Sequence, residues 1–426
     1  MEWKEKPNRK PLIIRGARQI GKTYSIREFG NKYYKGQVHE LNLEKYPELH
    51  GIFEQNFDID RIIFELELVF NKKITPTKDL LFIDEIQECP KAILSLRYFL
   101  EQKPDLHVIA AGSLLEFELR DISFPVGRVQ LMSMHPMNFY EFLLATGKGV
   151  LAEKLSQKPE KLPEPVHNLI NNELRKYFII GGMPECINTY TQTKSINEVQ
   201  QVQSDLIATF RQDFSKYAAN SNKNCLNSVL ASVSQKIGQQ IKYSQLADGF
   251  SGPTIKKAFE LLKTARIFKK VRAASPAGIP IGASARENKF KAIFLDIGLL
   301  SRLSGISSAF EINNTNLSGL FQGAMAEQFV GQEILSANYD DIFYWARQAK
   351  SSNAEIDFLI EKNGVIIPIE VKSGAAGSLK SLHILLKTFK NIKEAYIFSN
   401  NQQYGSIREQ KLTFFPLYFV FSALKK

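Results

Sequence analysis

Cysteine is scarce in this chain, with only three among 426 residues, at Cys89, Cys186 and Cys225. No two of them have C-x-x-C spacing, and an odd number leaves no complete disulfide framework. The sequence also lacks an apolar run long enough to span a membrane, and its polar, basic N-terminus does not resemble a secretory signal. We therefore expect a soluble, cytoplasmic protein without structural zinc, disulfides or a membrane span.

Acidic residues are in the minority, because 44 Asp and Glu stand against 55 Lys and Arg, which gives a formal net charge of +11. A basic chain favours anionic partners such as nucleic acid or a membrane surface. Most of the excess lies in residues 221–290, which contain 12 Lys and Arg but only three acids. We expect nucleic acid, in the first place DNA, as the partner of this segment.

Residues 16–23 have the sequence GARQIGKT and fit the phosphate-binding pattern G-x-x-x-x-G-K-[ST] at every fixed position. An apolar run at residues 11–14 suits a buried strand before the motif, and residues 23–29 can continue as a helix. In this motif the glycines permit tight turns, the lysine contacts the β- and γ-phosphates, and the hydroxyl ligates Mg²⁺. The alternative is an ordinary glycine loop between a strand and a helix. The predicted ATP site consists of Gly16, Ala17, Arg18, Gln19, Ile20, Gly21, Lys22 and Thr23.

A second stretch supports the nucleotide site. Residues 80–85, LLFIDE, are an apolar run that ends in two acids, as expected for a buried strand with carboxylates at its C-terminal end. Behind a phosphate loop, Asp84 is predicted to hold Mg²⁺ together with Thr23, and Glu85 to polarise the water that attacks the γ-phosphate.

Two further residues are candidates for sensing the nucleotide. Ser113 ends a predicted strand at residues 107–113, and in AAA-type P-loop ATPases a polar residue at this place senses the γ-phosphate. The alternative is a plain turn serine. Arg128 follows the turn at residues 124–127 and could stabilise γ-phosphate charge within its own chain or across a subunit boundary. A surface salt bridge is the alternative for Arg128, and the second role would require a homo-oligomer.

The basic segment has the spacing of a helix-turn-helix. Helices are predicted at residues 227–238, 243–248 and 253–265, the last capped by Ser251, and a strand at 267–272 with a Gly- and Pro-rich loop would form a wing. Lys256, Lys257 and Lys263 on the third helix are expected to meet phosphates. A winged helix that binds protein and has a solvated basic face is the alternative.

The C-terminal third is predicted to contain a helix at 321–337, strands at 341–347, 355–361 and 365–372, a helix at 379–389 and a strand at 394–398. Asn363 and Gly364 indicate a hairpin turn. The hairpin carries Asp357 on one strand and Glu370 with Lys372 on the other, so we predict Mg²⁺ between the two carboxylates beside a lysine that orients water or stabilises phosphate. A cross-strand salt-bridge ladder is the alternative.

Residues 16–23, 80–85, 125–128 and 136–143 resemble a widespread prokaryotic family of AAA-type P-loop ATPases. In that family the ATPase domain is followed by a winged helix and a C-terminal domain of unknown function, which residues 290–300, 323–327 and 369–374 match. The C-terminal elements are also similar to the PD-(D/E)XK nuclease fold. This resemblance implies a nuclease site at Asp357, Glu370 and Lys372, with Glu327 as the acid on the helix, although Ile356 stands where that pattern has proline.

The predicted fold class is α/β. We assign an AAA-type parallel sheet to residues 1–145, a helical connection to 146–220, a winged helix to 221–289 and a PD-(D/E)XK-like domain to 290–426. The predicted function is an ATP-hydrolysing, DNA-associated protein with a Mg²⁺-dependent nuclease-like domain. The alternative is an ATP-gated DNA- or protein-binding switch whose nuclease fold is not catalytic.

Overall fold

The computed structural model describes residues 1–113, 115–118, 125, 127–217, 222–305, 319–339, 341–349, 352–372, 379–400, 404–407, 409 and 411–425. Val126, Ser221, Ser373 and Gly374, which belong to segments singled out above, lie outside these residues. The chain divides into two compact units, Met1–Met134 and His135–Lys426. The first unit thus ends before residue 145, and the predicted subdivision of the second unit at residues 220 and 289 stays a prediction.

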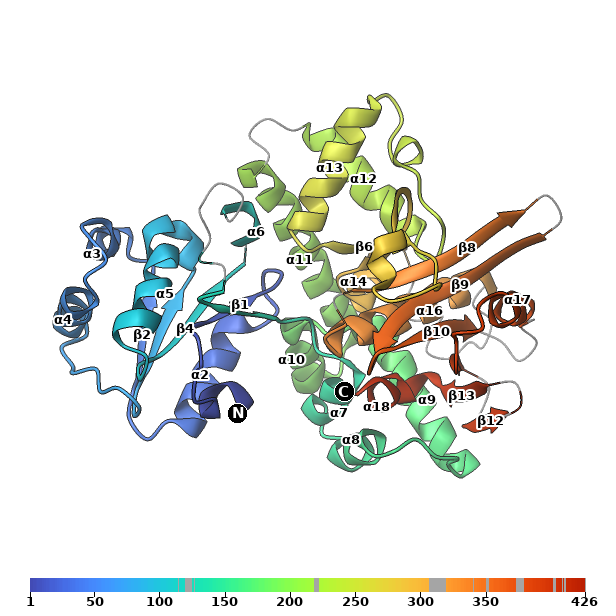
Figure 1. Cartoon of the computed structure of the whole chain (residues 1–426), viewed down its shortest axis with the longest axis horizontal. Helices are drawn as coiled ribbons and strands as arrows, with labels where there is room; N and C mark the ends of the chain where they lie inside the picture. Colours follow the sequence, from blue (N-terminus) through green and yellow to red (C-terminus); the bar gives the residue numbers. More distant parts are fainter. Residues whose placement is uncertain are drawn as a thin grey trace. The chain divides into compact units, whose positions relative to one another are not determined.

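A parallel sheet of five strands forms the centre of the first unit in the described residues (Figure 1). The strand order is β2-β3-β4-β1-β5, and every neighbouring pair is parallel. β3 is buried along its whole length, as its apolar sequence predicts. The strands are β1 (Leu12–Arg15), β2 (Val38–Asn42), β3 (Leu80–Asp84), β4 (His107–Gly112) and β5 (Gln130–Ser133).

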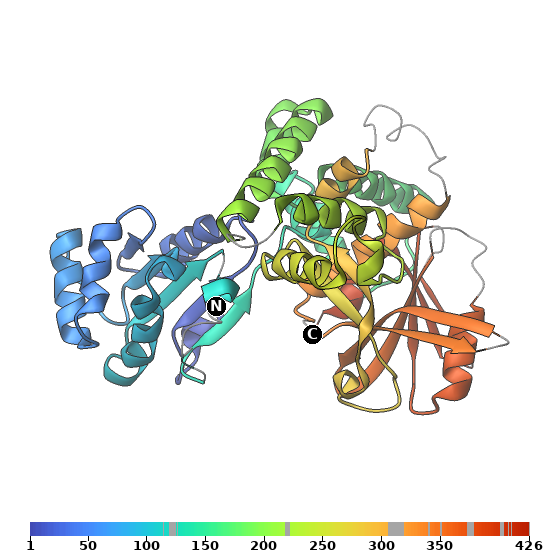
Figure 2. The same ribbon diagram turned by 90° about the horizontal axis from the view of Figure 1, so that it is seen from above.

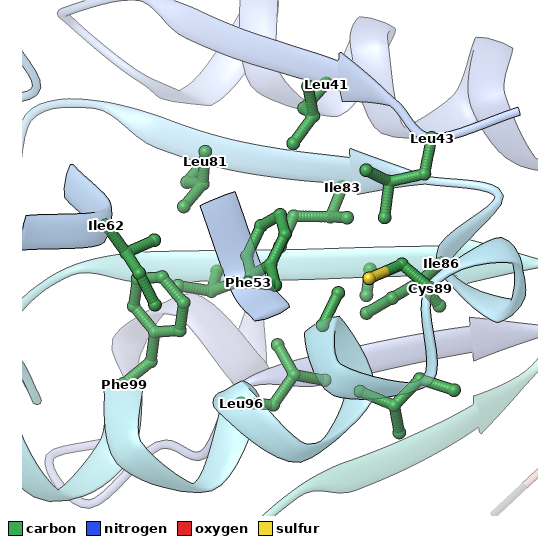
Figure 3. Packing of buried hydrophobic residues seen from close by; sticks show 14 of the residues in the cluster. Leu41, Leu43, Phe53, Ile62, Leu81, Ile83, Ile86, Cys89, Leu96 and Phe99 are labelled. Atoms are coloured by element: carbon green, nitrogen blue, oxygen red, sulfur yellow. The ribbon is translucent and has the colours of Figure 1, made fainter. Parts of the chain in front are cut away.

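Helices cover both faces of this sheet. Alternate strand residues, such as Leu81 and Ile83, pack with α3, α4 and α5, while Leu80 and Phe82 face α1 and α2. In Figure 3, Phe53 and Phe99 fill the space between these helices and the strands. The helical elements of this unit are α1 (Glu2–Glu5), α2 (Lys22–Tyr33), η1 (Pro47–His50), α3 (Gly51–Glu54), α4 (Ile59–Phe70), η2 (Ile86–Glu88), α5 (Pro90–Gln102) and α6 (Leu115–Glu118).

The second unit begins with a helical region and ends with a mixed sheet. No helix among the described residues has the length and apolar character needed to cross a membrane. The helical elements of the second unit are α7 (Phe139–Ala145), α8 (Gly149–Ser156), α9 (Glu164–Ile180), α10 (Pro184–Thr193), α11 (Ile196–Tyr217), α12 (Lys223–Gln235), η3 (Tyr243–Gln245), α13 (Gly252–Thr264), η4 (Ile281–Ser284), α14 (Ile297–Leu303), α16 (Gly319–Ser336), α17 (Lys380–Thr388), η6 (Leu417–Phe419) and α18 (Val420–Leu424).

In the described residues the second unit has one eight-stranded sheet, in the order β12-β13-β11-β10-β9-β8-β6-β7. The strand expected in the wing, β6, pairs with β7 and joins the sheet of the C-terminal strands, which the local sequence pattern did not indicate. The predicted order of α16, β8, β9, β10, α17 and β11 is confirmed. The strands are β6 (Phe268–Ala273), β7 (Arg286–Phe294), β8 (Phe343–Ala349), β9 (Ser352–Lys362), β10 (Val365–Lys372), β11 (Ala395–Ser399), β12 (Gly405–Ile407) and β13 (Leu412–Pro416).

Two helices pack on this sheet near the predicted C-terminal site. α16 contacts β7 and β10, whereas α17 packs against β9 and contributes Leu382 and Leu385 to an apolar cluster with Ile356 (Figures 1 and 2). The register of β8 and β9 shifts so that Tyr344 alone opposes both Asp357 and Phe358. Such a bulge re-aims the side chains of the longer strand.

Candidate functional site

The phosphate loop has the predicted strand, loop and helix context. β1 ends at Arg15 and α2 begins at Lys22, with Gly21 at the N-cap in the left-handed conformation, φ 90°. A Cβ at Gly16 would lie 2.5 Å from the Met134 carbonyl oxygen, so a larger residue does not fit there. The buried Lys22 ammonium donates to the carbonyl oxygens of Gly16 (3.1 Å) and Ala17 (2.7 Å). The loop thus places this cation at a helix N-terminus, where anions bind.

Asp84 lies at the end of β3 and faces the start of α2. Its Oδ2 accepts from the Thr23 hydroxyl at 3.0 Å and from Asn42 Nδ2 at 3.3 Å. Burial raises the pKa of Asp84, and the neighbouring Glu85 carboxylate adds to this, while the Thr23 hydrogen bond opposes it. A buried carboxylate next to a hydroxyl is a donor set of the hard-oxygen kind that Mg²⁺ uses. Thr23 and Asp84 therefore fit the metal predicted for them.

Glu85 is held by side chains from two other segments. Gln87 Nε2 donates to Glu85 Oε2 at 2.6 Å, and the Ser113 hydroxyl reaches the same oxygen at 3.4 Å. Arg18 of the phosphate loop donates from Nε to the Ser113 hydroxyl at 3.3 Å. The structure thus brings Arg18, Ser113 and Glu85 together, while the γ-phosphate-sensing role of Ser113 and the water-polarising role of Glu85 stay predictions.

Gln87 is a site residue that sequence reasoning missed. It is buried, and a Cβ at Gly112 would lie 2.4 Å from its Oε1, so the glycine at the end of β4 makes room for this amide. The available signal was a polar residue two positions after Glu85, which the structure places within the turn η2. Its bond to Glu85 depends on that turn, which the pattern of residues 80–85 does not specify.

Arg128 lies away from the phosphate loop within its own unit. It precedes β5 at the N-terminal edge of the parallel sheet, whereas the loop follows β1 at the C-terminal edge. Its Nε lies 3.6 Å from Glu101 Oε1, which is the surface salt bridge weighed above. The predicted role of Arg128 in stabilising the γ-phosphate of its own chain is thus not supported, because the two groups are at opposite strand ends.

At the predicted C-terminal site, Glu370 and Lys372 lie on the same side of β10. Lys372 Nζ donates to Glu370 Oε1 at 2.5 Å, while Glu370 Oε2 is buried and has no hydrogen-bond partner. Burial raises the pKa of Glu370 to about 8, and the Asp357 carboxylate adds to this shift. Asp357 accepts from the Val371 amide at 2.8 Å, next to the last paired residues of β9 and β10, Phe358 and Ile369.

Lys291 on β7 is the residue that the sequence analysis missed at this site. Its ammonium lies 2.9 Å from Glu327 Oε1, 2.5 Å from Glu355 Oε1 and 3.2 Å from Asp357 Oδ1, and its side chain is only 2% exposed. Burial alone would lower the pKa of Lys291, but the three carboxylates outweigh it and raise the pKa well above its usual value. We call Lys291, Glu327, Glu355 and Asp357 the Lys291 cluster. Its signal was a lysine within the apolar run of β7.

The Lys291 cluster does not fit the Mg²⁺ predicted between Asp357 and Glu370. Unlike Asp84, whose hydrogen-bond donors are uncharged, Asp357 is paired with a buried ammonium through Oδ1, and its Oδ2 accepts from the Val371 amide. Glu370 has one oxygen without a donor, and Glu327 already pairs with Lys291. Among the described residues no group of three or more His, Cys, Asp and Glu side chains is arranged to hold a metal ion. Lys291 supplies a positive charge beside Asp357, one of the two acids between which the metal was predicted.

Residues 8–143 match a family model described as an AAA domain. This match covers the N-terminal unit, whose parallel sheet and phosphate loop are consistent with an AAA-type P-loop fold. Residues 171–309 match a domain of unknown function, DUF8612, and residues 322–419 match another, DUF4143. Neither description names a winged helix or a nuclease, so these two assignments stay predictions. A comparison with curated proteins gives no match.

Solved structures show only distant likenesses to the chain. The structure of Drosophila ORC bound to DNA has a TM-score of 0.29 and 12% identity, covering 72% of this chain and 92% of that chain. The S. cerevisiae Hsp104-ADP complex has a TM-score of 0.28 and 15% identity, with 62% and 37% covered. Protein VC1899 from Vibrio cholerae has a TM-score of 0.21 and 10% identity, with 97% and 96% covered. At these scores the likenesses carry no argument about this chain.

Proposed function

We propose that the protein binds ATP with Mg²⁺ and hydrolyses it at residues 16–23. The observation that supports this most directly is the 3.0 Å hydrogen bond between the Thr23 hydroxyl and Asp84, which joins the phosphate loop to the acid at the end of β3. These are the two groups that P-loop enzymes use to hold Mg²⁺ against the nucleotide. Bound Mg²⁺ supplies charge neutralisation to the phosphates.

The remaining residues of the site have separate roles in this proposal. Lys22 exchanges its bonds to the Gly16 and Ala17 carbonyl oxygens for bonds to the phosphates. Glu85 polarises the attacking water, and Ser113, which lies between Arg18 and Glu85, senses the γ-phosphate. In a homo-oligomer, Arg128 would act on the nucleotide of a neighbouring copy.

Equilibrium binding of labelled ATP and steady-state phosphate release test this proposal. Lys22→Ala should lose ATP binding, and Glu85→Gln should bind ATP while its turnover falls by about 10²–10⁴-fold. Lys32→Ala is the matched control, because Lys32 lies exposed at the other end of α2. Equal ATP affinity in Lys22→Ala and the parent would show that residues 16–23 are an ordinary glycine loop.

We further propose that residues 222–289 bind DNA through its phosphates. α12, η3, α13 and the β6–β7 hairpin follow one another in the order of a winged helix, although the predicted second helix is only the short turn η3. Ser251 caps α13, and Lys256 and Lys257 are exposed on this helix. Glu287 pairs with Lys270 (2.8 Å) and Arg272 (2.7 Å), so part of the basic charge is already neutralised.

For the C-terminal domain, the binding function is better supported than nuclease activity. The observation that favours it is the bond from Lys372 to Glu370, which turns one of the three N–H donors of this ammonium toward an acid instead of water or phosphate. In this proposal ATP turnover controls binding of DNA or protein by the second unit. The nuclease assignment of Asp357, Glu370, Lys372 and Glu327 remains the competing proposal.

Incubation with DNA separates these two functions. Purified parent and Asp357→Ala proteins are incubated with supercoiled, linear and branched DNA and Mg²⁺, with and without ATP. The binding function predicts that both proteins leave every substrate intact, or that any trace cleavage is equal in both. Cleavage by the parent that disappears in Asp357→Ala, while ATP turnover persists, would establish the nuclease instead.

A further inference from the structure

We propose that Lys291 is the resident cation of the C-terminal carboxylate site, so that this site folds and functions with a lysine ammonium in place of a divalent metal ion. The inference concerns the second unit alone and does not depend on the proposed ATP hydrolysis.

The first step is the count of donors and acceptors. An ammonium group has three N–H donors, and Lys291 has three carboxylate partners, Glu327, Glu355 and Asp357, at 2.9, 2.5 and 3.2 Å. These partners come from α16 and β9, while Lys291 itself comes from β7. Each N–H donor of this buried lysine thus has its own carboxylate partner. The arrangement is firmly held, because breaking one pair leaves an uncompensated buried charge.

The second step is the way neighbouring residues close around the cluster. Gln240 Nε2 donates to Glu355 Oε2 at 2.6 Å, and a backbone bridge pairs Ile241 with Phe290, the residue before Lys291. A Cβ at Gly238 would lie 3.1 Å from Glu327 Oε2. The Tyr344 ring centroid lies 5.7 Å from Nζ, on the short side of the β8–β9 bulge. The segment after α12 thus closes on the carboxylates of the cluster, and the Tyr344 ring of β8 lies near the ammonium.

The third step compares the ammonium with a metal ion. Mg²⁺ requires near-octahedral oxygen ligands and normally retains several waters. In the Lys291 cluster, one oxygen of each carboxylate accepts a hydrogen bond from the ammonium instead of binding a metal ion. The Lys291 side chain is only 2% exposed, so it has little contact with water. If the lysine side chain were replaced by an apolar one, three partly buried carboxylates would face each other without a cation. Such a site should then take up a divalent ion.

Mn²⁺ alone is the probe for a direct test, with free Mn²⁺ measured by electron paramagnetic resonance. The full chain carries Asp84→Asn, so that the phosphate loop contributes no metal ligand, and no nucleotide is present. We expect no Asp357-dependent Mn²⁺ binding with Lys291 in place. Lys291→Met should gain about one Mn²⁺ per chain, and adding Asp357→Asn should remove this gain. Lys291→Arg keeps the positive charge and should gain none.

Lys372→Met is the matched control, because Lys372 pairs with Glu370 and lies outside the Lys291 cluster. It should not reproduce the gain seen in Lys291→Met. Thermal unfolding gives a second readout, since Mn²⁺ should raise the melting temperature of Lys291→Met and leave that of the chain with Lys291 unchanged. If Lys291→Met does not fold, Lys291→Gln, which keeps an N–H donor, takes its place.

Two results would overturn the inference. One is Mn²⁺ binding by the chain with Lys291 in place that Asp357→Asn abolishes, because the site would then hold a metal beside the lysine. The other is a folded Lys291→Met or Lys291→Gln protein that gains no Mn²⁺, because the ammonium would then not occupy a cation position.

Discussion

The Thr23 hydroxyl donates to Asp84 Oδ2 across 3.0 Å, although Thr23 lies on the helix after β1 and Asp84 ends β3, and these two strands are not neighbours in the sheet. Thr23 follows β1, Asp84 ends β3, and β4 lies between these strands. Because parallel strands bring their carboxyl ends to one edge, residues 61 positions apart in the sequence meet there. This relationship makes the Thr23 hydroxyl a direct test of the nucleotide site.

We predict that Thr23→Val lowers Mg²⁺-dependent ATP turnover by about 10–100-fold, because it keeps the shape of the side chain but removes the hydroxyl that faces Asp84. Thr23→Ser should restore most of the activity. Phosphate release is measured at increasing Mg²⁺, and chelation by EDTA should silence the parent. Equal Mg²⁺ dependence in Thr23→Val and the parent would remove Thr23 from the metal site.

Gln87 is predicted to act as a positioning residue for Glu85. Gln87→Ala should lower kcat by about 10–100-fold, because a hydrogen bond to a charged group contributes about 1.5–3 kcal/mol. ATP affinity should stay unchanged, since Gln87 contacts the acid and not the phosphate loop. Gln55→Ala, at an exposed position after α3, is the matched control. A Gln87→Ala protein with parental kcat would mean that Glu85 is held sufficiently by other groups.

Lys256 and Lys257 are predicted to contact DNA phosphates, with a smaller contribution from Lys263, which pairs with Glu260. Changing all three to Glu should reduce the slope of log affinity against log salt by about 2–3, because each phosphate contact contributes about 0.9. Fluorescence anisotropy of a labelled duplex at several salt concentrations measures this slope.

The control for the DNA prediction has the same change in net charge at a different place. Lys148, Lys158 and Lys161 are exposed residues before α9, and changing them to Glu should leave the salt slope nearly unaltered. If both triple variants alter the slope equally, net charge alone explains the binding. An unchanged slope in the α13 variant would assign its basic face to solubility.

The strand, loop and helix around residues 16–23 could be predicted from the sequence because the signals for them are local. Residues 16–23 and 80–85 carry both the turn geometry and the reactive groups within a few positions. The prediction from the sequence failed where an interaction joins elements that are far apart along the chain. Lys291 contacts Asp357 only because β7 and β9 belong to the same sheet. The presence of a lysine in an apolar strand does not indicate which acid it pairs with.

Smaller differences have local causes. By residue type Asp58 and Asp60 are equally suitable N-caps for α4, but the helix begins at Ile59 and Asp58 accepts from the Asp60 and Arg61 amides. Both aspartates have the short acceptor side chain that a cap requires. The backbone angle φ at Glu85 is 48°, a left-handed value that glutamate rarely adopts. The residue types around Glu85 do not predict this conformation.

The last prediction concerns Glu333, which is buried on α16 and accepts from the Phe139 amide at 2.8 Å. Burial raises the pKa of Glu333 from 4.5 to about 8, and the Phe139 hydrogen bond opposes that shift. The folded state therefore binds this proton more tightly than the unfolded state does. The stability that this carboxyl group contributes is fully present below pH 4.5 and is lost as the pH rises to about 8.

Glu333→Gln should remove this part of the pH dependence, because an amide oxygen can also accept from Phe139 but does not titrate. Relative to the variant, the parent should lose on the order of 4 kcal/mol of unfolding free energy across this range. Urea unfolding at a series of pH values measures the difference, and Glu198→Gln, exposed on α11, is the control. The comparison with the variant is needed because other buried acids, Glu327 and Glu370 among them, shift in the same direction. Parallel stability curves for the parent and Glu333→Gln would show that Glu333 is ionised in the folded protein.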